Sequence, residues 1–277
     1  MRESRLLSLA LIAPALTILL LLFVYPLGFS LVTAFVDQER AWTLGNFTKA
    51  FDFYSRDILF TLLIVALSTL LIGLSAVAIG GYLVLGENPR AVAALKWLYR
   101  WPLFIPFVVA GQLMRTFLAK NGMMNNILVE IGLLAPLQAQ SFLDWRGIVI
   151  TFVWKQTPFV ALLVAGAMAS LDRSTFESAR NLGAGRLRIL FEIVVPQVRP
   201  TLVVGLILSF VIMMSVLSVP LMINAQSPTM LTVDMAFRIN SYGDYGVANA
   251  LGFISYLMTG AVAWIYLRQT VREAGPP

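Results

Sequence analysis

The sequence predicts an all-α membrane protein with about six transmembrane helices and a two-helix loop between the fourth and fifth. Three observations support this fold class. Of the 277 residues, 59% are hydrophobic and only 12% are charged, whereas soluble domains carry about 25% charged residues. The mean hydropathy is +0.83. The apolar residues also gather in segments of roughly 20 residues, the length that crosses a bilayer. We therefore expect one membrane domain over residues 1–277.

Six apolar segments are predicted to span the membrane. They are residues 6–24 (continuing to 35), 58–85, 101–117, 147–169, 201–222 and 246–267. The polar connections are residues 37–57, 120–143 (with a short amphipathic helix over 125–133) and 224–244. The first segment could be a signal peptide, because Arg2 and Arg5 precede it. It is longer than the roughly 7–15 apolar residues of such peptides, which favours an uncleaved first span.

Two features inside the spans are predicted to shape them. Gly73, Gly80 and Gly81 in the second span are candidates for close helix contact, because a missing side chain lets backbones approach. In the fourth span, the segment from Lys155 to Pro158 is predicted to interrupt the helix, because proline lacks a backbone N–H.

The basic residues favour one orientation of these spans. With the N-terminus in the cytoplasm, 12 of the 20 Lys and Arg residues fall on the cytoplasmic side, which is the positive-inside pattern. They are Arg2, Arg5, Arg90, Lys96, Arg100, Arg173, Arg180, Arg186, Arg188, Arg199, Arg268 and Arg272. We therefore expect both termini to be cytoplasmic. The net charge of +6 then reflects topology, and we expect no nucleic-acid partner.

Charged and apolar residues alternate most regularly between Asp172 and Pro200, a segment that we call the 172–200 loop. Ser174 and Glu177 have the spacing of a capping box, so a short helix is predicted to start at Ser174. Gly183 stands where a helix end needs a residue that can take positive φ.

A second short helix is predicted after Gly183. Leu187, Leu190, Phe191 and Val194 have the spacing of an apolar stripe. Pro196 is predicted to end the regular hydrogen bonding of this helix. The 172–200 loop is thus expected to form two short helices with a glycine elbow, beside the membrane.

The 172–200 loop resembles a cytoplasmic loop of the permease subunits of binding-protein-dependent ABC importers. That signature has a Glu-Ala-Ala triplet, a Gly four residues after the last Ala, a hydrophobic helix and Ile-x-x-Pro. The residues at matching positions are Glu177, Ser178, Ala179, Gly183, Ala184, Ile193 and Pro196. Ser178 replaces the middle Ala of the signature, and Leu182 stands where many sugar permeases have Asp. The flanking sequence is most similar to that of the polyamine, opine, phosphonate and ferric-iron permeases. This resemblance implies that the cargo is a polyamine, opine, phosphonate or similar small polar solute.

The resemblance implies a division of labour in a bacterial inner membrane. Two permeases, identical or different, would form the path, an external solute-binding protein would deliver the cargo, and two separate ATPase subunits would bind ATP and Mg²⁺. The sequence contains no G-x-x-x-x-G-K-[ST] motif, so this chain has no P-loop and is expected to hold no cofactor. Glu177 would either bond a basic group of the ATPase or only complete its own capping box.

Polar side chains inside the spans are candidates for the substrate path. Such groups are costly in lipid and usually face a cavity or a partner. The candidates are Lys155, Gln156, Thr157, Arg115, Asn249 and Tyr256. Lys155 would suit an anionic cargo better than a polyamine. Alternatively, its side chain extends toward the membrane surface or makes a structural bond between helices.

Composition and motifs weigh against other classes of protein. The chain has no Cys and no His, which excludes thiol nucleophiles, imidazole bases and zinc chemistry. We therefore expect no enzymatic activity in this chain. A secondary carrier would be expected to show buried carboxylates, and the predicted spans contain no Asp or Glu. A sugar-type ABC permease and an ATPase-independent carrier are kept as the alternatives.

Overall fold

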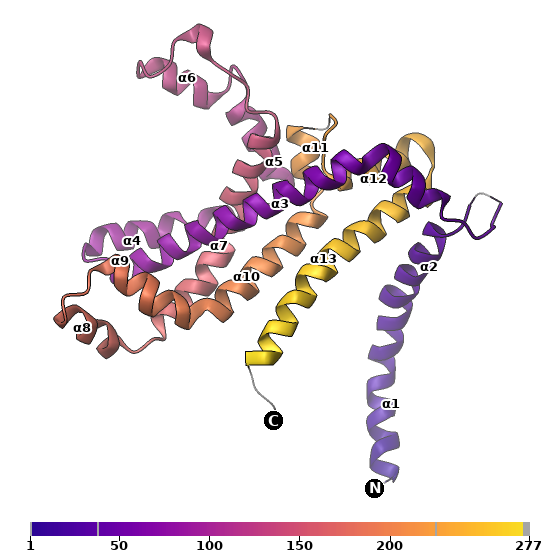
Figure 1. Ribbon diagram of the computed structural model, residues 1–277, viewed down its shortest axis with the longest axis horizontal. Helices are drawn as coiled ribbons and strands as arrows, with labels where there is room; N and C mark the ends of the chain where they lie inside the picture. The colour runs from indigo at the N-terminus through magenta and orange to yellow at the C-terminus, as the bar shows by residue number, and fades with distance from the viewer. Residues whose placement is uncertain (1, 38, 225, 274–277) are drawn as a thin grey trace. The chain divides into compact units, whose positions relative to one another are not determined.

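The computed structural model consists of helices (Figure 1) and describes residues 2–37, 39–224 and 226–273. In that part of the chain the extended pairing is limited to a bridge between Val36 and Trp42. The helices are α1 (Arg2–Leu19), η1 (Leu20–Val24), α2 (Tyr25–Ala34), α3 (Gly45–Leu85), α4 (Pro89–Leu98), η2 (Trp101–Phe104), α5 (Phe107–Leu118), α6 (Met123–Glu130), η3 (Pro136–Gln138), α7 (Trp145–Ala169), α8 (Arg173–Asn181), α9 (Arg186–Ile189), η4 (Leu190–Val194), α10 (Val195–Ser215), α11 (Ser218–Ile223), α12 (Leu231–Tyr242) and α13 (Tyr245–Glu273). Of the η elements, η1 and η4 are π-helical, and η2 and η3 are 3-10 helices. The predicted all-α fold class is confirmed.

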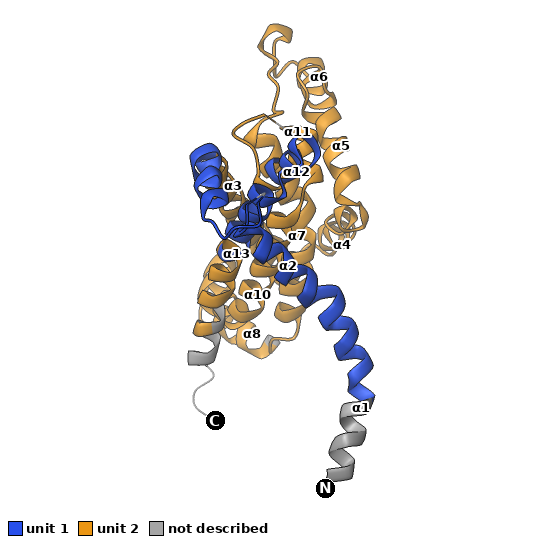
Figure 2. Ribbon diagram, turned by 90° about the vertical axis from the view of Figure 1, so that its right-hand side faces the viewer, with its two compact units in different colours: residues 1–56, 234–257 blue, residues 57–233, 258–277 orange. Residues whose placement is uncertain are grey.

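The helices form two compact units, which Figure 2 colours separately. The first contains residues 1–56 and 234–257, and the second contains residues 57–233 and 258–277. The second unit holds α4 to α11, including the whole 172–200 loop. That unit therefore carries most of the candidate functional residues, while the single domain over 1–277 stays a prediction.

Five helical segments of the described residues are long and apolar enough to cross a membrane. They are Leu11–Ala34, Gly45–Leu85, Trp145–Ala169, Arg186–Ser215 and Tyr245–Ile265. They match the predicted first, second, fourth, fifth and sixth spans, which supports a multi-pass membrane protein.

The predicted third span is wrong as one straight helix. The helices Pro89–Phe104 and Phe107–Glu130 are bent by 109° at a short break, so they count as a sixth span only when taken as one broken pair. Ile105 lies at the break with φ −88° and ψ 121°. It precedes Pro106, whose ring disfavours a helical conformation at the preceding residue.

Several predicted boundaries between spans and loops are also wrong. α3 begins at Gly45, inside the predicted polar connection 37–57, and α12 occupies 231–242 of the predicted connection 224–244. The predicted fifth span, 201–222, ends early at Ser215, before a separate helix, α11. A drop in hydropathy indicates where a helix leaves lipid, whereas the backbone hydrogen bonds of the helix continue into the polar segment. Hydropathy therefore located the spans but not their helical ends.

The glycines of α3 bring this helix close to its neighbours, as predicted. A Cβ placed on Gly73 would lie 3.3 Å from Leu206 Cδ1, and one on Gly81 would lie 2.8 Å from Leu190 Cδ1. Gly80 is in similarly tight contact with α7. Small residues on one helix let the backbone of another approach, so α3 packs directly against α7, η4 and α10.

A buried carboxylate fastens α3 to the loop that precedes α12. Asp57 is 3% exposed, and its Oδ1 accepts the backbone N–H of Thr229 at 2.6 Å and the hydroxyl of Ser227 at 3.4 Å. One turn later, Thr61 Oγ1 accepts the N–H of Leu231 at 3.0 Å. The start of α12 is thus held by two side chains of α3.

Replacing Asp57 by Ala is expected to lower the free energy of unfolding by about 1–3 kcal/mol, because the buried N–H of Thr229 loses its acceptor. The measurement is the thermal unfolding of the purified chain in detergent. The control is Asp52→Ala, since Asp52 is an exposed carboxylate in the same helix. Equal melting temperatures for both variants would contradict the proposed role of Asp57.

Candidate functional site

The 172–200 loop begins with a cap that differs from the predicted one. The N-cap of α8 is Asp172, whose Oδ1 accepts the N–H of Ser174 at 2.9 Å, while the Ser174 hydroxyl donates to Oδ2 at 2.7 Å. These two hydrogen bonds hold the pKa of the Asp172 carboxyl below its usual value. The predicted capping box of Ser174 and Glu177 is therefore wrong, because Asp172 fills the N-cap position. Glu177 is exposed, and among the described side chains no hydrogen bond to it is found.

The end of α8 confirms the predicted role of Gly183. Its φ is +85°, and its N–H donates to the carbonyl of Arg180 at 2.9 Å. The N–H of Ala184 donates to the carbonyl of Ala179 at 3.0 Å. These two bonds form a Schellman motif, in which a glycine commonly takes the left-handed conformation. A Cβ on Gly183 would meet no atom within 4 Å, so the position requires the conformation of glycine rather than its small size.

α8 turns one face toward the helices and another toward solvent. Phe176 is buried and packs with the hydrophobic core of the second unit, and Ala179 is partly buried against it. Glu177 and Ser178 are exposed, and Leu182 at the tip is 88% exposed. The signature residues Glu177 and Ser178 therefore lie on the exposed face of α8, whereas Ala179 faces the core.

Glu87 fastens the 172–200 loop to the end of α3, and sequence reasoning missed it. Its carboxylate pairs with both Arg180 of α8 and Arg186 of α9. All three side chains are at least half exposed, so these pairs contribute little to the free energy of folding. Their effect is geometric, because one acid holds both short helices at the turn after α3. The sequence signal was a lone acid in a basic turn.

The second half of the loop continues into α10 without the predicted stop. α9, η4 and α10 form one uninterrupted helical run, and Pro196 lies in the first turn of α10. In the π turn of η4, the backbone hydrogen bond spans five residues instead of the usual four. The N–H of Val195 donates to the carbonyl of Leu190. A single π turn at a proline absorbs the missing N–H without breaking the helix. The prediction that Pro196 ends the helix is therefore wrong.

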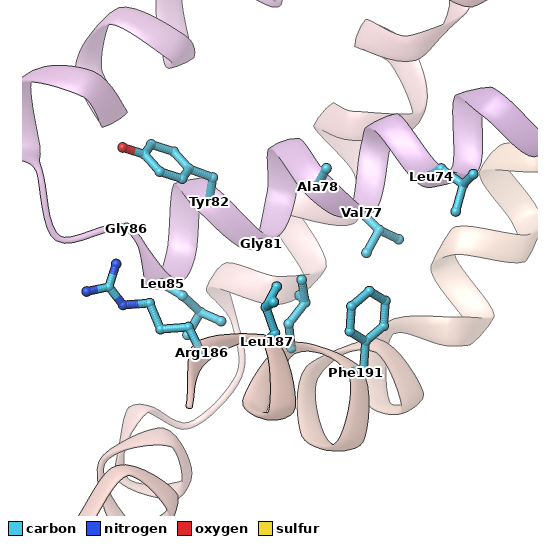
Figure 3. A pocket seen from close by; sticks show the side chains of 11 residues that line it. Leu74, Val77, Ala78, Gly81, Tyr82, Leu85, Gly86, Arg186, Leu187 and Phe191 are labelled. Carbon is cyan, nitrogen blue, oxygen red and sulfur yellow. The ribbon is translucent and has the colours of Figure 1, made fainter. Parts of the chain in front are cut away.

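The predicted apolar stripe of this helix divides into two parts. Leu190 and Val194 are buried, whereas Leu187 is 72% and Phe191 60% exposed. The exposed pair lines an apolar groove together with α3 residues such as Val77 (Figure 3). Ile193 is partly buried against the core. Only part of the predicted apolar stripe therefore packs against the core.

Lys155 of α7 binds the break in the third span. α7 is continuous from Trp145 to Ala169, so the predicted interruption of this helix is wrong. The Lys155 ammonium donates to the carbonyl of Leu103 at 3.2 Å and lies 5.1 Å from the ring centroid of Phe107. Lys155 as a whole is only 6% exposed. This geometry matches the structural bond between helices that the sequence left open.

Gln156 and Thr157 lie inside the packing between helices. Their Nε2 and Oγ1 atoms are buried and have no hydrogen-bond partner among the described residues, and the same holds for the Ser209 hydroxyl of α10. A Cβ on Gly205, one turn before Ser209, would lie 3.3 Å from Val160, one turn after Gln156. α7 and α10 are therefore in contact one turn away from Gln156 on one helix and from Ser209 on the other. Buried polar atoms without a hydrogen-bond partner among the described residues thus lie close to the contact between these two helices.

The remaining candidates for the path lie elsewhere. Arg115 is exposed, and its Nη1 donates to the carbonyl of Met222 at 2.8 Å. Asn249 accepts the hydroxyl of Ser30 at 2.8 Å. Tyr256 is 58% exposed on α13. Asn249 and Tyr256 belong to the first unit and Arg115 and Lys155 to the second, so neither unit alone contains the whole predicted set.

The family of the chain follows from its sequence beyond the 172–200 loop. A family model described as "Binding-protein-dependent transport system inner membrane component" matches residues 77–268. The chain belongs to this family. It is a permease subunit of the ABC importer type, as the resemblance implied, and a transport subunit rather than an enzyme. The matched region of the permease includes α8, the Glu87 turn and the polar part of α7.

Two relatives and one solved structure extend the match over nearly the whole permease. The sulfoquinovosyl glycerol transport system permease protein SmoG of Agrobacterium fabrum is 29% identical, over 96% of this chain and 90% of the relative. The trehalose/maltose transport system permease protein MalF of Thermococcus litoralis is 25% identical, over 96% and 94%. A crystal structure of a bacterial alginate ABC transporter with its periplasmic protein contains a chain with TM-score 0.81 and 21% identity, covering 98% of this chain and 96% of that one. The last likeness shows the fold alone.

Replacing Lys155 of this permease by Met is expected to lower the free energy of unfolding by about 1.5–3 kcal/mol, because a charge-assisted hydrogen bond to the break at Leu103 is lost. The measurement is the melting temperature in detergent, with exposed Lys49→Met as the control. Reconstituted uptake should fall only in proportion to the folded protein. Unchanged stability together with impaired uptake would instead assign Lys155 to the substrate path.

Proposed function

We propose that this permease forms one half of the path of an ATP-driven importer and receives the driving motion through the 172–200 loop. The observation that supports this proposal most directly is the structure of α8, with one buried and one exposed face. Phe176 anchors the helix in the core, Gly183 fixes its end by a positive φ, and Glu177, Ser178 and Leu182 lie exposed. A rigid knob with a charged and apolar outer face suits insertion into a groove of a partner subunit.

The partner that the knob fits is a separate ATPase. The chain itself has no P-loop motif, so nucleotide must be bound elsewhere. Glu177 is not engaged in the predicted capping box, because Asp172 caps α8. Its carboxylate is therefore available for a charge-assisted bond to a basic group of the ATPase. ATP and Mg²⁺ would be held by that subunit.

The transmission of motion rests on two connections of the loop. Glu87 pairs with Arg180 and Arg186, and Phe176 and Leu190 are buried in the core against which the end of α3 packs, so α8 and the run that starts with α9 move with the end of α3. The helical run from Arg186 to Ser215 is unbroken, so α9 and α10 move together. Closure of the ATPase would then tilt α3 and α10 and open the path to the other side. The second permease, whether identical or different, would form the opposite wall.

The cargo is proposed to be a sugar or a sugar derivative delivered by an external solute-binding protein. The amino-acid sequence of the 172–200 loop predicted a polyamine, opine or phosphonate cargo. The full-length relatives SmoG and MalF are named for a sulfoquinovosyl glycerol and for trehalose and maltose, which favours the sugar-type alternative.

The position of the path within the subunit is also a proposal. Arg115 and Tyr256 are exposed and could line a path shared with the second permease. Lys155, Gln156 and Thr157 are buried within one unit, so cargo would reach them only if α7 parted from its neighbours. Asn249 is partly buried and bonded to Ser30.

Co-expression with candidate ATPase, second-permease and binding-protein genes tests the function. The permease is expected to co-purify with the ATPase, and the purified chain alone should hydrolyse no ATP. In vesicles, uptake should require both ATP and the binding protein. Uptake by the chain alone, driven by an ion gradient, would overturn the proposal in favour of a secondary carrier.

The proposed orientation places both termini and the 172–200 loop in the cytoplasm. The native chain has no Cys, so single cysteines report cleanly. Leu137 is 98% exposed in the connection before α7, and Ser178 is exposed in the loop. An impermeant maleimide should label Leu137→Cys in intact cells and label Ser178→Cys only after permeabilisation. The reverse pattern would overturn the orientation.

A further inference from the structure

A cavity of about 300 Å³ lies beside α8, at the ends of two spans. It is formed by the last turns of α3 and α7, the end of α4 and the start of α8, which Figure 1 shows gathered at one end of α3. Its lining residues are Leu83, Val84, Lys96, Tyr99, Arg100, Leu162, Ala165, Gly166, Met168, Ala169, Leu171 and Phe176. The walls are apolar, and the charged groups of the lining are both cations.

No acidic side chain of the described residues neutralises the two cations of the lining. Lys96 lies in the last turn of α4 and Arg100 two residues after its end, and both line the cavity. Arg100 Nε donates to the Tyr99 hydroxyl at 3.2 Å, which is a neutral partner. Among the described side chains, neither cation makes an ion pair, and the acid that precedes α4, Glu87, is engaged by Arg180 and Arg186.

The position of the cavity is that of a membrane boundary. The spans that contribute to it end at Leu85 and Ala169. Trp97 and Trp101 form an edge-to-face pair with ring centroids 4.3 Å apart and are 60% and 54% exposed. Exposed tryptophans gather where the lipid headgroups begin. The cavity therefore opens at headgroup level, with its cations positioned for phosphate and its walls for hydrocarbon.

We propose that this cavity binds one anionic phospholipid. The headgroup phosphate lies on Lys96 and Arg100, and the beginning of an acyl chain packs against Leu162 and Val84. A free inorganic anion would gain the two charges but nothing from the apolar walls, and a zwitterionic lipid would gain the walls but less from the charges. Because Phe176 of α8 forms part of the wall, the bound lipid also braces the 172–200 loop.

Lipid titration of the purified full-length chain in a non-ionic detergent tests the proposal. Native mass spectrometry would count bound dioleoyl phosphatidylglycerol, with dioleoyl phosphatidylcholine and inorganic phosphate as parallel arms. One phosphatidylglycerol is expected to bind with preference over phosphatidylcholine. The double variant Lys96→Gln/Arg100→Gln should bind it roughly thirty-fold more weakly, for two charges near an anionic lipid.

Two further variants separate the cavity from general surface charge. Arg90→Gln removes a cation from the start of the same helix, outside the lining, and should bind lipid as the wild type does. Gly166→Leu adds a side chain where a Cβ meets no atom within 4 Å, fills the cavity and leaves both cations in place. It should weaken binding about as much as the double variant, with an unchanged melting temperature in the absence of lipid.

Four outcomes would overturn the proposal. They are wild-type binding by the double variant, equal weakening by Arg90→Gln, wild-type binding by Gly166→Leu, and displacement of the lipid by inorganic phosphate alone. The second would indicate a diffuse basic surface, and the last would indicate a simple anion site.

Discussion

Replacing Gly183 by Val is expected to abolish uptake while the permease still folds and reaches the membrane. Gly183 has φ +85° at the end of α8, and a left-handed conformation costs an L-residue about 1–2 kcal/mol, more when the residue is β-branched. A Cβ there meets no atom within 4 Å, so the strain stays in the Schellman turn. The turn is expected to reopen, and α8 would then present Glu177 and Leu182 in the wrong direction.

The measurement is binding-protein-stimulated ATP hydrolysis and uptake in vesicles, with the amount of assembled complex determined by blot. Gly185→Val is the matched control, because Gly185 lies two residues on with φ −70° and ψ 159° and also has open space around its Cβ. Gly183→Asn should retain part of the activity, since Asn tolerates the left-handed region. Normal uptake by Gly183→Val would remove the 172–200 loop from the mechanism.

Replacing Gly147 by Ala is expected to have the largest effect on folding. A Cβ on Gly147 would lie 2.2 Å from the carbonyl oxygen of Phe142 and 2.9 Å from Ile223 Cγ2. The Phe142 backbone cannot move freely, because its N–H donates to the carbonyl of Leu118 at 3.0 Å. Forcing extra atoms into such packing typically costs about 1–3 kcal/mol, and a backbone clash belongs at the upper end.

The measurement for Gly147→Ala is the yield of monodisperse protein in size-exclusion chromatography together with its melting temperature. Gly260→Ala is the matched control, because Gly260 also lies inside a long helix, α13, but its Cβ would meet nothing within 4 Å. Alanine raises helix propensity at both positions. Equal melting temperatures for Gly147→Ala and Gly260→Ala would contradict the prediction. They would show that the backbone at the start of α7 moves easily enough to accommodate the added Cβ.

The spans were predictable because lipid imposes a simple rule on them. A helix that crosses a bilayer must be apolar over about 20 residues, so five spans followed from hydropathy alone. The break at Ile105 and Pro106 did not follow, since proline is tolerated in many membrane helices. The π turn at 190–194 was equally hidden, because the sequence before Pro196 fits an α-helix and a π turn alike.

The candidate site was predictable where a single position decides the geometry. Gly183 was found because few other residues take a positive φ at a helix end. The cap of α8 was missed because Asp172 and Ser174 are both good N-cap residues, and spacing alone did not choose between them. The pairing of Glu87 with Arg180 joins residues 93 positions apart. A contact of that kind depends on how α3 packs, which one sequence does not record.

Two contacts hold the helical run from Arg186 to Ser215 against α3, one between Gly81 and Leu190 and one between Gly73 and Leu206. The two glycines are about 12 Å apart along α3, whereas the two leucines are about 24 Å apart along the run. The run therefore curves between its two contacts, in the stretch that holds the π turn and Pro196. A displacement of the loop end would move this curved run and α3 as one body, because both ends of the curve are fixed to the same helix.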